Sequence, residues 1–421
     1  MNAITAIAPI LTDAADPECH DAEWVGEIRA ADTFAASVAL AESGGYRRAR
    51  LLVRDGSSVL GFISVGVEDG CAIGREIARE ASRLPARTDE PAAAPYRGPV
   101  SVVVCTRDRP RDLRRALESI QQLDYPDFEV VVVDNASSSL DTWRIVAALD
   151  DSRFHVVNGA VPGLASARNR GVEAARHEVL AFTDDDVSVD TDWLAMLVRS
   201  FADPEVGCTT GLVPPAQLRN PAQLSFQRRV GWTPQLSTAT FRISDGPANG
   251  PLFPFNVARY GTGANFAARR SVLLDLGGFD EGLGAGAPTR GGEDIDWFVR
   301  CIVAGHTLVF DPDAVVWHVH RDDVDDLSAQ AAAYGTGLGA WLTKVALDRE
   351  LRPIAARRTA AAARHLITSL NDRAHADGTT GGPSRTATRD EFFGLLRGPG
   401  ALWQARTQGR RAAPLCRTDG G

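Results

Sequence analysis

Three adjacent aspartates, Asp184, Asp185 and Asp186, follow a short apolar run and have the clearest capacity for chemistry in this sequence. Such carboxylates repel one another, by about 4 kcal/mol for a pair ~4 Å apart at an effective dielectric constant of ~20. A bound Mg²⁺ or Mn²⁺ would convert that repulsion into coordination, because hard divalent cations combine protein carboxylates with substrate phosphates. We therefore expect a site for a metal and a diphosphate. An acidic loop that caps a helix near Asp190 is the alternative.

Polar residues end two other apolar runs in the same way. Thr106 and Arg107 follow residues 100–105, and Asp134 follows residues 128–133. If these runs are neighbouring parallel strands, their carboxyl ends meet at one edge of a sheet, where ligands bind. Asp134 could there accept a hydrogen bond from a ribose hydroxyl or a base N–H, but an Asp-Asn turn explains it equally well.

A second acidic pair, Glu293 and Asp294, begins a predicted helix that ends near Gly305. Seven glycines lie within residues 277–292, just before this pair, and they predict a loop that approaches a ligand closely. A carboxylate beyond such a loop is a candidate general base. Stabilisation of the helix dipole by acids in the first turn is the alternative reason for the pair.

Two histidines share one face of a predicted strand over residues 314–320. His318 and His320 alternate with Trp317, which faces the other way. Imidazoles at positions i and i+2 can join a metal site and suit Mn²⁺ better than Mg²⁺. A pair of surface histidines is the alternative.

The elements that position these residues alternate between strand and helix. Continuous apolar runs predict strands, and residues with helical spacing lie between them. Strands without polar alternation indicate a parallel sheet covered by helices on both faces, and so an α/β fold. The expected strands cover 100–105, 128–133, 154–157 and 178–183, and the expected helices cover 111–122, 142–149 and 164–175.

The remaining sequence predicts two flanking units around a domain at residues 96–320. Residues 1–95 form a small α+β unit with a linker: a hairpin at 50–67, helical composition near 27–42 and 73–83, and a proline-rich stretch at 85–99. Residues 226–255 read as irregular. Residues 321–421 are expected to be helical and basic, with helices over 327–371 and 391–411.

Charge is unevenly distributed along the 421 residues. The net charge is −9, and residues 351–421 contribute +7, so the rest of the chain carries −16. An acidic body argues against nucleic-acid binding as the main task. The basic region could lie on an anionic membrane surface, or it is simply a solvated helical face.

Other sequence features exclude several classes of protein. Six scattered cysteines without a C-x-x-C pair argue against a zinc ribbon and a disulfide scaffold. We see neither a signal peptide nor an apolar stretch of about 18 residues, so we expect a cytoplasmic protein, with contact at the inner face of the membrane as a further option. A G-x-G-x-x-G loop is missing after the first strand, and the sole lysine is Lys344, which excludes a dinucleotide oxidoreductase and a P-loop enzyme.

Taken in order, the motifs over residues 99–320 resemble family 2 glycosyltransferases with the GT-A fold. The resemblance implies a mostly parallel nucleotide-sugar-binding sheet and an inverting, metal-dependent enzyme with a DxD motif. The segments that carry it are VSVVVCTRDRP, VVVVDNAS, GLASARNRG, FTDDDV, GTGANFAARR, GGFDEGLG with GGEDIDW, and VVWHVH.

The same resemblance implies roles for individual residues. The nucleoside would be held by Thr106, Arg107 and Asp134, with Arg168 and Asn169 lining the pocket for base and ribose. Asp184 and Asp186 would meet the metal and the diphosphate, and Asp185 would face the sugar. Asp294 would be the catalytic base, with Glu293 or Trp297 near the acceptor. His318, and after it His320, would complete the site of the metal, Mn²⁺ or Mg²⁺.

The implied reaction moves a sugar from a nucleoside-diphosphate sugar to an acceptor hydroxyl, and the resemblance favours UDP as the carrier. The acceptor could be a glycan, a lipid-linked intermediate or a small metabolite. A nucleotide-sugar-binding or scaffold protein with a degenerate site is the alternative, although such a protein should have lost some of the acids. Asp186, Asp294 and His318 are all present.

Overall fold

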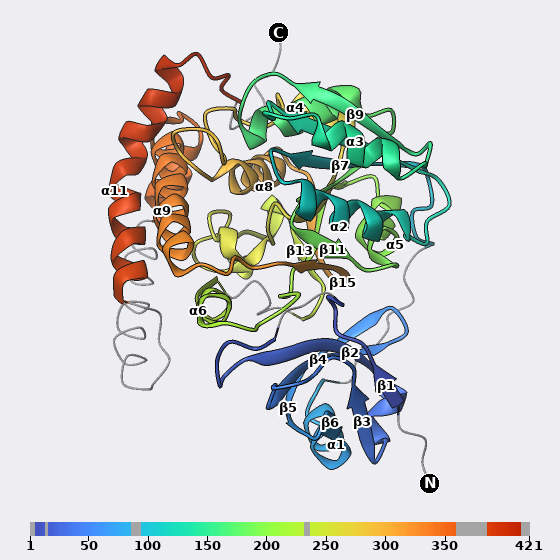
Figure 1. Ribbon diagram of the computed structural model, residues 1–421. Coiled ribbons are helices and arrows are strands. Elements are labelled where there is room, and N and C mark those ends of the chain that lie inside the picture. Colours follow the sequence, from blue (N-terminus) through green and yellow to red (C-terminus); the bar gives the residue numbers. More distant parts are fainter. Residues whose placement is uncertain (1–4, 13–15, 86–93, 231–235, 359–384, 414–421) are drawn as a thin grey trace.

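The computed structural model describes residues 5–12, 16–85, 94–230, 236–358 and 385–413. A nine-stranded mixed sheet forms the middle of the molecule, in the order β11-β15-β12-β14-β10-β7-β8-β9, with β13 paired to β15. A six-stranded sheet from the start of the chain lies beneath it, and two long helices lie at one margin (Figure 1). This arrangement agrees with the expected α/β class and the GT-A type.

Four consecutive parallel strands form one half of the central sheet. They are β7 (Val100–Thr106), β8 (Phe128–Asn135), β9 (Phe154–Gly159) and β10 (Val179–Thr183). Their crossovers are α2 (Pro110–Gln121), α3 (Asp141–Ala148) and α4 (Leu164–Ala174). The apolar runs therefore predicted these strands correctly.

Side chains of these strands alternate between two hydrophobic layers. Val102 and Val104 pack in the cluster that includes Leu113 and Leu117 of α2. Val103, between them, packs in the cluster that includes Val172 of α4. Because each strand is buried on both faces, a run of valines fits it better than an alternating pattern does.

The other half of the sheet is mixed. Strand β14 (Asn265–Arg269) runs antiparallel to both β10 and β12 (Val206–Leu212), and β15 (Thr307–His318) runs parallel to β12. The short strands β11 (Val187–Val189) and β13 (Ala239–Phe241) run antiparallel to β15. Helices α5 (Trp193–Val198), α6 (Pro221–Val230), α7 (Arg270–Asp275) and α8 (Glu293–Val303) accompany this half, so the segment expected to be irregular begins inside α6.

The N-terminal unit consists of β1 (Thr5–Ile7), β2 (Glu23–Arg29), β3 (Ser37–Leu40), β4 (Arg48–Asp55), β5 (Ser58–Glu68), β6 (Cys71–Ile73) and α1 (Gly74–Ala81). The predicted hairpin is confirmed as β4 and β5, and the helix near 73–83 as α1. The helix near 27–42 is wrong, because Val38 and Leu40 alternate inward on a strand. Much of the expected linker lies outside the described residues.

Polar contacts attach the N-terminal unit to the central sheet. The Val59 amide donates to Asp313 Oδ1 at 2.8 Å, and Arg54 pairs with Asp190 at 3.3 Å. Asp313 also accepts from Arg199 at 2.8 Å. These contacts join β4 and β5 to the edge of the sheet opposite β9, away from the carboxyl ends of β7, β8 and β10.

Two parallel helices, α9 (Val324–Leu347) and α11 (Arg385–Thr407), form most of the described part of the C-terminal region. Their contact surface is made of glycines: a Cβ on Gly339 would lie 2.2 Å from the Leu395 carbonyl oxygen, and one on Gly398 2.3 Å from the Ala340 nitrogen. Both predicted helices exist, although the expected extension over 359–371 lies outside the described residues. Among the described helices, none is long and apolar enough to cross a membrane.

A buried ion network joins these C-terminal helices to α8. Lys344 Nζ lies 2.8 Å from Asp280 Oδ2 and 2.8 Å from Asp296 Oδ1. Arg406 of α11 donates to both oxygens of Asp280, at 2.7 and 2.6 Å, and Arg300 donates to Asp296 at 2.8 Å. The two aspartates are 0% exposed, so each depends on its cations for compensation.

We expect Lys344→Met to lower the free energy of unfolding by about 3 kcal/mol, because it leaves excess negative charge buried beside Asp280 and Asp296. Urea denaturation followed by tryptophan fluorescence measures the change. Arg144→Gln, which removes an exposed pair with Asp141, is the control and should change stability by less than ~1 kcal/mol. Equal stabilities of the two variants would contradict the prediction.

Candidate functional site

The carboxyl ends of β7, β8 and β10 bring the predicted polar residues to one edge of the sheet. Thr106 and Asp134 are register partners, and Thr183, which precedes the three aspartates, pairs with Val104. The Thr106 hydroxyl donates to Asp185 Oδ2 at 2.7 Å. Arg107 lies at the rim, with its side chain 50% exposed.

Two arginines compensate the three aspartates. Arg109 Nη1 lies 3.1 Å from Asp185 Oδ1 and 3.1 Å from Asp186 Oδ2. Arg168 Nη2 lies 3.4 Å from Asp184 Oδ1 on the other side of the cluster. The repulsion inferred from the sequence is therefore met partly by protein cations, and Asp184 and Asp186 still keep side-chain exposures of 30% and 20%.

Burial makes these acids weaker than free carboxyls. It raises the pKa of Asp184 to about 7, with Asp186 and Asp185 adding to the shift and Arg168 opposing it. It raises the pKa of Asp185 to about 6, against the opposing effect of Arg109 and of the Thr106 hydrogen bond. The cluster thus holds more negative charge than its two arginines fully offset, and an added cation would stabilise it.

The acidic pair of α8 lies across from this cluster and shares its buried arginine. Arg168 Nη1 donates to Glu293 Oε1 at 2.9 Å, and its Nη2 donates to the Gly263 carbonyl at 2.8 Å. The Gly263 amide in turn donates to Asp294 Oδ2 at 2.9 Å. Arg168 is 2% exposed, so a single buried side chain connects Asp184 to the acidic pair.

The two acids of the pair differ in burial. Glu293 is 5% exposed, and burial raises its pKa to about 7, with Asp294 adding to the shift and Arg168 opposing it. Asp294 is half-buried, and its Oδ1 accepts from the Ile295 amide at 2.8 Å. Of the two carboxylates, that of Asp294 can therefore meet a ligand, while that of Glu293 is buried against Arg168.

The two predicted histidines lie together next to Asp186. His318 Nε2 lies 3.4 Å from Asp186 Oδ1, and its Nδ1 lies 3.0 Å from His320 Nδ1. His320 Nε2 lies 3.1 Å from Gln227 Oε1, and burial lowers the pKa of both imidazoles. If both imidazoles are neutral, His320 Nε2 donates to Gln227 and His318 Nδ1 donates to His320 Nδ1. The lone pair of His318 Nε2 then points toward Asp186.

Asp134 is held by the helix that follows it. Its Oδ2 accepts from Trp143 Nε1 at 3.0 Å and its Oδ1 from Thr142 at 3.4 Å. Asp134 is 6% exposed, and these bonds fix its carboxylate at the strand end. The remaining lone pairs are still available to a ribose hydroxyl or a base N–H.

Two predicted site residues have other tasks. The Asn169 amide accepts from the Phe279 amide at 2.8 Å and donates to the Phe279 carbonyl at 3.0 Å and to Glu281 at 3.1 Å. These bonds use its hydrogen atoms and fix the glycine-rich loop, so we withdraw Asn169 from the nucleoside pocket. We also withdraw Trp297 from the acceptor side, because it is 0% exposed and packs against Phe279.

The sequence analysis assigned no role to three residues near the site. Arg109 follows the motif residue Arg107 by two positions, and Gln227 lies in the segment taken as irregular. Tyr334 of α9 lies close enough to Asp294, Asp186 and Asp184 to interact with their charges. The residues around Tyr334 have helical spacing, which predicts a helix. That spacing does not indicate which face of the helix borders the site.

The donor set fits a divalent metal only in part. Among the described residues, no three His, Cys, Asp or Glu side chains are arranged to hold a metal ion by themselves. Asp186 and His318 lie side by side at 3.4 Å, which supplies one carboxylate and one imidazole. Mg²⁺ and Mn²⁺ sites that serve phosphates commonly use one or two protein ligands and complete their shell with substrate oxygens and water.

Comparison with known proteins places this domain in a family. Residues 101–277 match the family model described as "Glycosyl transferase family 2". The pre-mycofactocin glycosyltransferase of Mycobacterium tuberculosis (strain ATCC 25618 / H37Rv) is 32% identical over 247 residues, which are 58% of this chain and 48% of that protein. The O-antigen biosynthesis protein RfbC of Myxococcus xanthus is 32% identical over 197 residues, 44% of this chain and 15% of that protein. The chain thus spans about half the length of the first relative and less of the second.

Comparison with solved structures gives a partial match. The mannosyltransferase PcManGT from Pyrobaculum calidifontis, in complex with GDP-Man and Mn²⁺, aligns with a TM-score of 0.48 at 23% identity, over 76% of this chain and 90% of that chain. The matched family model covers β7 to α7, which includes the three aspartates and Arg168 but not α8. Residues 101–277 are therefore a domain of glycosyltransferase family 2.

Proposed function

We propose that this protein transfers a sugar from a nucleoside-diphosphate sugar to an acceptor hydroxyl, with inversion at the anomeric carbon. One observation carries the proposal: the Asp184–Asp186 cluster and the Glu293–Asp294 pair are joined through Arg168. A donor bound at the cluster then presents its sugar toward Asp294. Residues 96–320 would contain this machinery, and a UDP-sugar is the first donor to test.

The strand ends supply the donor side. Thr106, Arg107 and Asp134 surround the position expected for the nucleoside, at the carboxyl ends of β7 and β8. Asp184 and Asp186 would face the diphosphate, and Asp185, tied to Thr106 and Arg109, would sit under the sugar. Asp185 is 5% exposed, so its contribution is to hold Thr106 and Arg109 in position.

Asp186 and His318 would hold the metal, Mn²⁺ or Mg²⁺, together with diphosphate oxygens. Bound there, the ion would neutralise charge on the departing nucleoside diphosphate. Asp184 would contribute from beside Arg168. The mixed carboxylate–imidazole pair favours Mn²⁺ over Mg²⁺.

Asp294 is the proposed general base. It would accept the proton of the acceptor hydroxyl as that oxygen bonds to the anomeric carbon and the bond from that carbon to the diphosphate breaks. The Gly263 and Ile295 amides hold its two oxygens at 2.9 and 2.8 Å, which fixes the direction in which the carboxylate can accept a proton. A base on the face opposite the leaving group gives inversion.

Tyr334 and Arg229 replace Trp297 as the acceptor-side candidates. The Arg229 guanidinium lies 5.9 Å from the centre of the Tyr334 ring, and Gln330 donates to the Tyr334 hydroxyl at 3.2 Å. Tyr334 is 37% exposed, so its ring can meet a ligand. An aromatic face with a nearby cation suits a glycan or another polar acceptor.

A scaffold that binds nucleotide-sugars without transfer is the second candidate. Arg109 spans Asp185 and Asp186 and could take the place of a metal in such a protein. Against this, Asp294 keeps a carboxylate that is only half-buried, which binding alone would not require.

We expect slow hydrolysis of the matching donor by the purified protein with Mn²⁺, found by screening a panel of nucleotide-sugars. Asp186→Ala should reduce the release of nucleoside diphosphate by about 100-fold or more, because charge stabilisation at the leaving group is lost. Glu173→Ala, an exposed change on α4, is the control and should keep full release. Tight nucleotide binding without release from any donor would favour the scaffold.

Asp294→Asn should keep donor affinity and lose transfer by about 10²–10⁴-fold in kcat, because the amide cannot take the acceptor proton. Calorimetry with the donor and a transfer assay with the acceptor measure the two quantities separately. Transfer at the normal rate in this variant would remove Asp294 from the mechanism.

The chain from Gln227 through His320 to His318 gives a third test. Gln227→Leu should weaken the affinity for Mn²⁺, in the presence of nucleoside diphosphate, by about 10-fold, because loss of the acceptor for His320 frees the tautomer of His318. Gln227→Glu keeps an acceptor and is the matched control. Free Mn²⁺ measured by electron paramagnetic resonance reports the affinity directly. Equal affinities of the two variants would show that Gln227 has no such role.

A further inference from the structure

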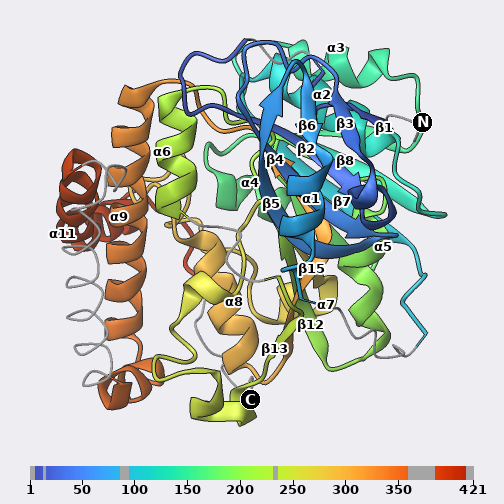
Figure 2. The same cartoon turned by 90° about the horizontal axis from the view of Figure 1, so that it is seen from below.

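Helix α11 presents an apolar stripe on the side that faces away from the rest of the molecule. Phe392, Leu396 and Trp403 lie on one face of the helix and are 57%, 62% and 72% exposed. Phe393, next to them, is 44% exposed. Both views place α11 outside α9, at the margin of the molecule (Figures 1 and 2). Large apolar side chains gathered in this way mark an interaction surface.

The opposite face of α11 is fully used. Gly394, Gly398 and Leu402 are buried against α9, and glycine contacts bring the two backbones close together. The stripe is therefore not part of the described packing between these helices. It is a separate face of the same helix, offset by about half a turn.

Both acids of α11 have partners on neighbouring helices, and the arginines beside the stripe do not. Asp390 accepts from Ser328 of α9 at 2.5 Å, and Glu391 lies 3.8 Å from Arg229 of α6. Within the part of the chain that the structure describes, Arg389 and Arg397 form no ion pair. The outer face of α11 is thus apolar and positively charged.

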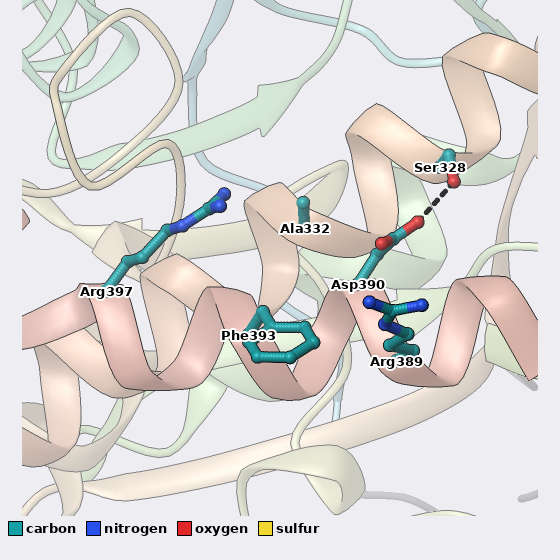
Figure 3. A pocket seen from close by; sticks show the side chains of 6 residues that line it. All are labelled: Ser328, Ala332, Arg389, Asp390, Phe393 and Arg397. Atoms are coloured by element: carbon teal, nitrogen blue, oxygen red, sulfur yellow. Dashed lines mark hydrogen bonds between the residues drawn. The ribbon is translucent and has the colours of Figure 1, made fainter.

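A cavity lies along the flank of the stripe and contains both arginines. Its volume is 510 Å³, and it is lined by Ser328 and Ala332 of α9 and by Arg389, Asp390, Phe393 and Arg397 of α11. The Asp390 carboxylate in this lining accepts from the Ser328 hydroxyl. Phe393 lies between the two arginines, and the Arg389 guanidinium is 5.5 Å from the centre of the Phe393 ring (Figure 3). Two unpaired guanidinium groups at one hollow suit a phosphate, which they can bind through paired N–H donors.

We propose that the outer face of α11 docks onto the surface of an anionic bilayer, with lipid phosphates at Arg389 and Arg397. Phe392, Leu396 and Trp403 enter the boundary between headgroups and acyl chains, as aromatic and leucine side chains of interfacial helices do. Residues 351–421 carry a net charge of +7 against −16 for the rest of the chain, so an anionic surface attracts the C-terminal region and repels the remainder.

Charge favours a bilayer over a second copy of the chain. A two-fold contact through this face would bring Arg389 and Arg397 of one copy near those of the other. The anionic surface instead compensates them. The proposal does not depend on the transfer reaction, because binding to vesicles can be measured without donor or acceptor.

The full chain should bind phosphatidylcholine vesicles that contain about 30% phosphatidylglycerol and bind pure phosphatidylcholine vesicles much less, with the difference lost at high salt. Flotation of vesicles measures the bound fraction. The combined change Phe392→Ser, Leu396→Ser and Trp403→Ser should weaken binding by about 10-fold or more. Arg389→Gln with Arg397→Gln should remove the preference for anionic lipid.

Matched controls use exposed residues on other elements. Phe34→Ser with Leu140→Ser removes side chains that are 78% and 63% exposed, and Arg144→Gln with Arg170→Gln removes exposed arginines of α3 and α4. Both should bind as the unchanged protein does, and circular dichroism confirms that every variant is folded. Equal binding to neutral and anionic vesicles, or normal binding by the triple variant, would overturn the proposal. A dimer in solution that the triple variant abolishes, without vesicle binding, would assign the face to a second copy and also overturn it.

Discussion

One buried guanidinium holds together two groups of acids that would otherwise repel each other. Arg168 lies between Asp184 and Glu293, and its charge is surrounded by the rings of Phe266 and Phe279, at 5.5 and 5.8 Å. Taking a cation into such surroundings is costly unless carboxylates accompany it, and the carboxylates are equally costly without the cation. The guanidinium of Arg168 and the carboxylates of Asp184 and Glu293 therefore stay close together because each compensates the buried charge of the other. The raised pKa values of Asp184 and Glu293 show that the compensation is incomplete.

The position of the acidic pair depends on the C-terminal helices as much as on the sheet. Helix α8 begins after Gly292, whose φ is 96°, and this turn packs directly on α9: a Cβ on Gly337 would lie 2.6 Å from the Gly291 carbonyl carbon. Lys344 then fixes the far side of α8 through Asp296. The donor side rests on strand ends inside the matched family region. The proposed base, Asp294, is instead positioned by packing between loops and helices that follow the matched region. Different parts of the fold therefore position the two sides of the site.

The sequence predicted the parts of this site that local pattern controls. Valine runs specified the parallel strands, and the residues at their ends had to meet at one edge. The destination of a side chain on a helix is set by tertiary contacts, which spacing does not encode. Asn169 therefore ended as a clamp on Phe279 and Trp297 as part of the core. Residues 27–42 were predicted to be helical from their composition, but Val38 and Leu40 alternate toward the core and form a strand. The role of Gln227 could not be predicted from the sequence, because only the folded structure brings it next to His320.

The proposed acceptor wall and the exposed stripe of α11 are linked through a few side chains. Arg229 of α6 lies beside Tyr334 at the proposed acceptor wall, and the same arginine lies 3.8 Å from Glu391 of α11. Glu391 adjoins Phe392, the first residue of the exposed stripe. A displacement of α11 must therefore move a charge that the acceptor wall depends on. The tight glycine contacts between α9 and α11 leave little room for the helices to slide independently. For these reasons, a contact that holds the outer face of α11 would also restrain the position of Arg229 beside Tyr334.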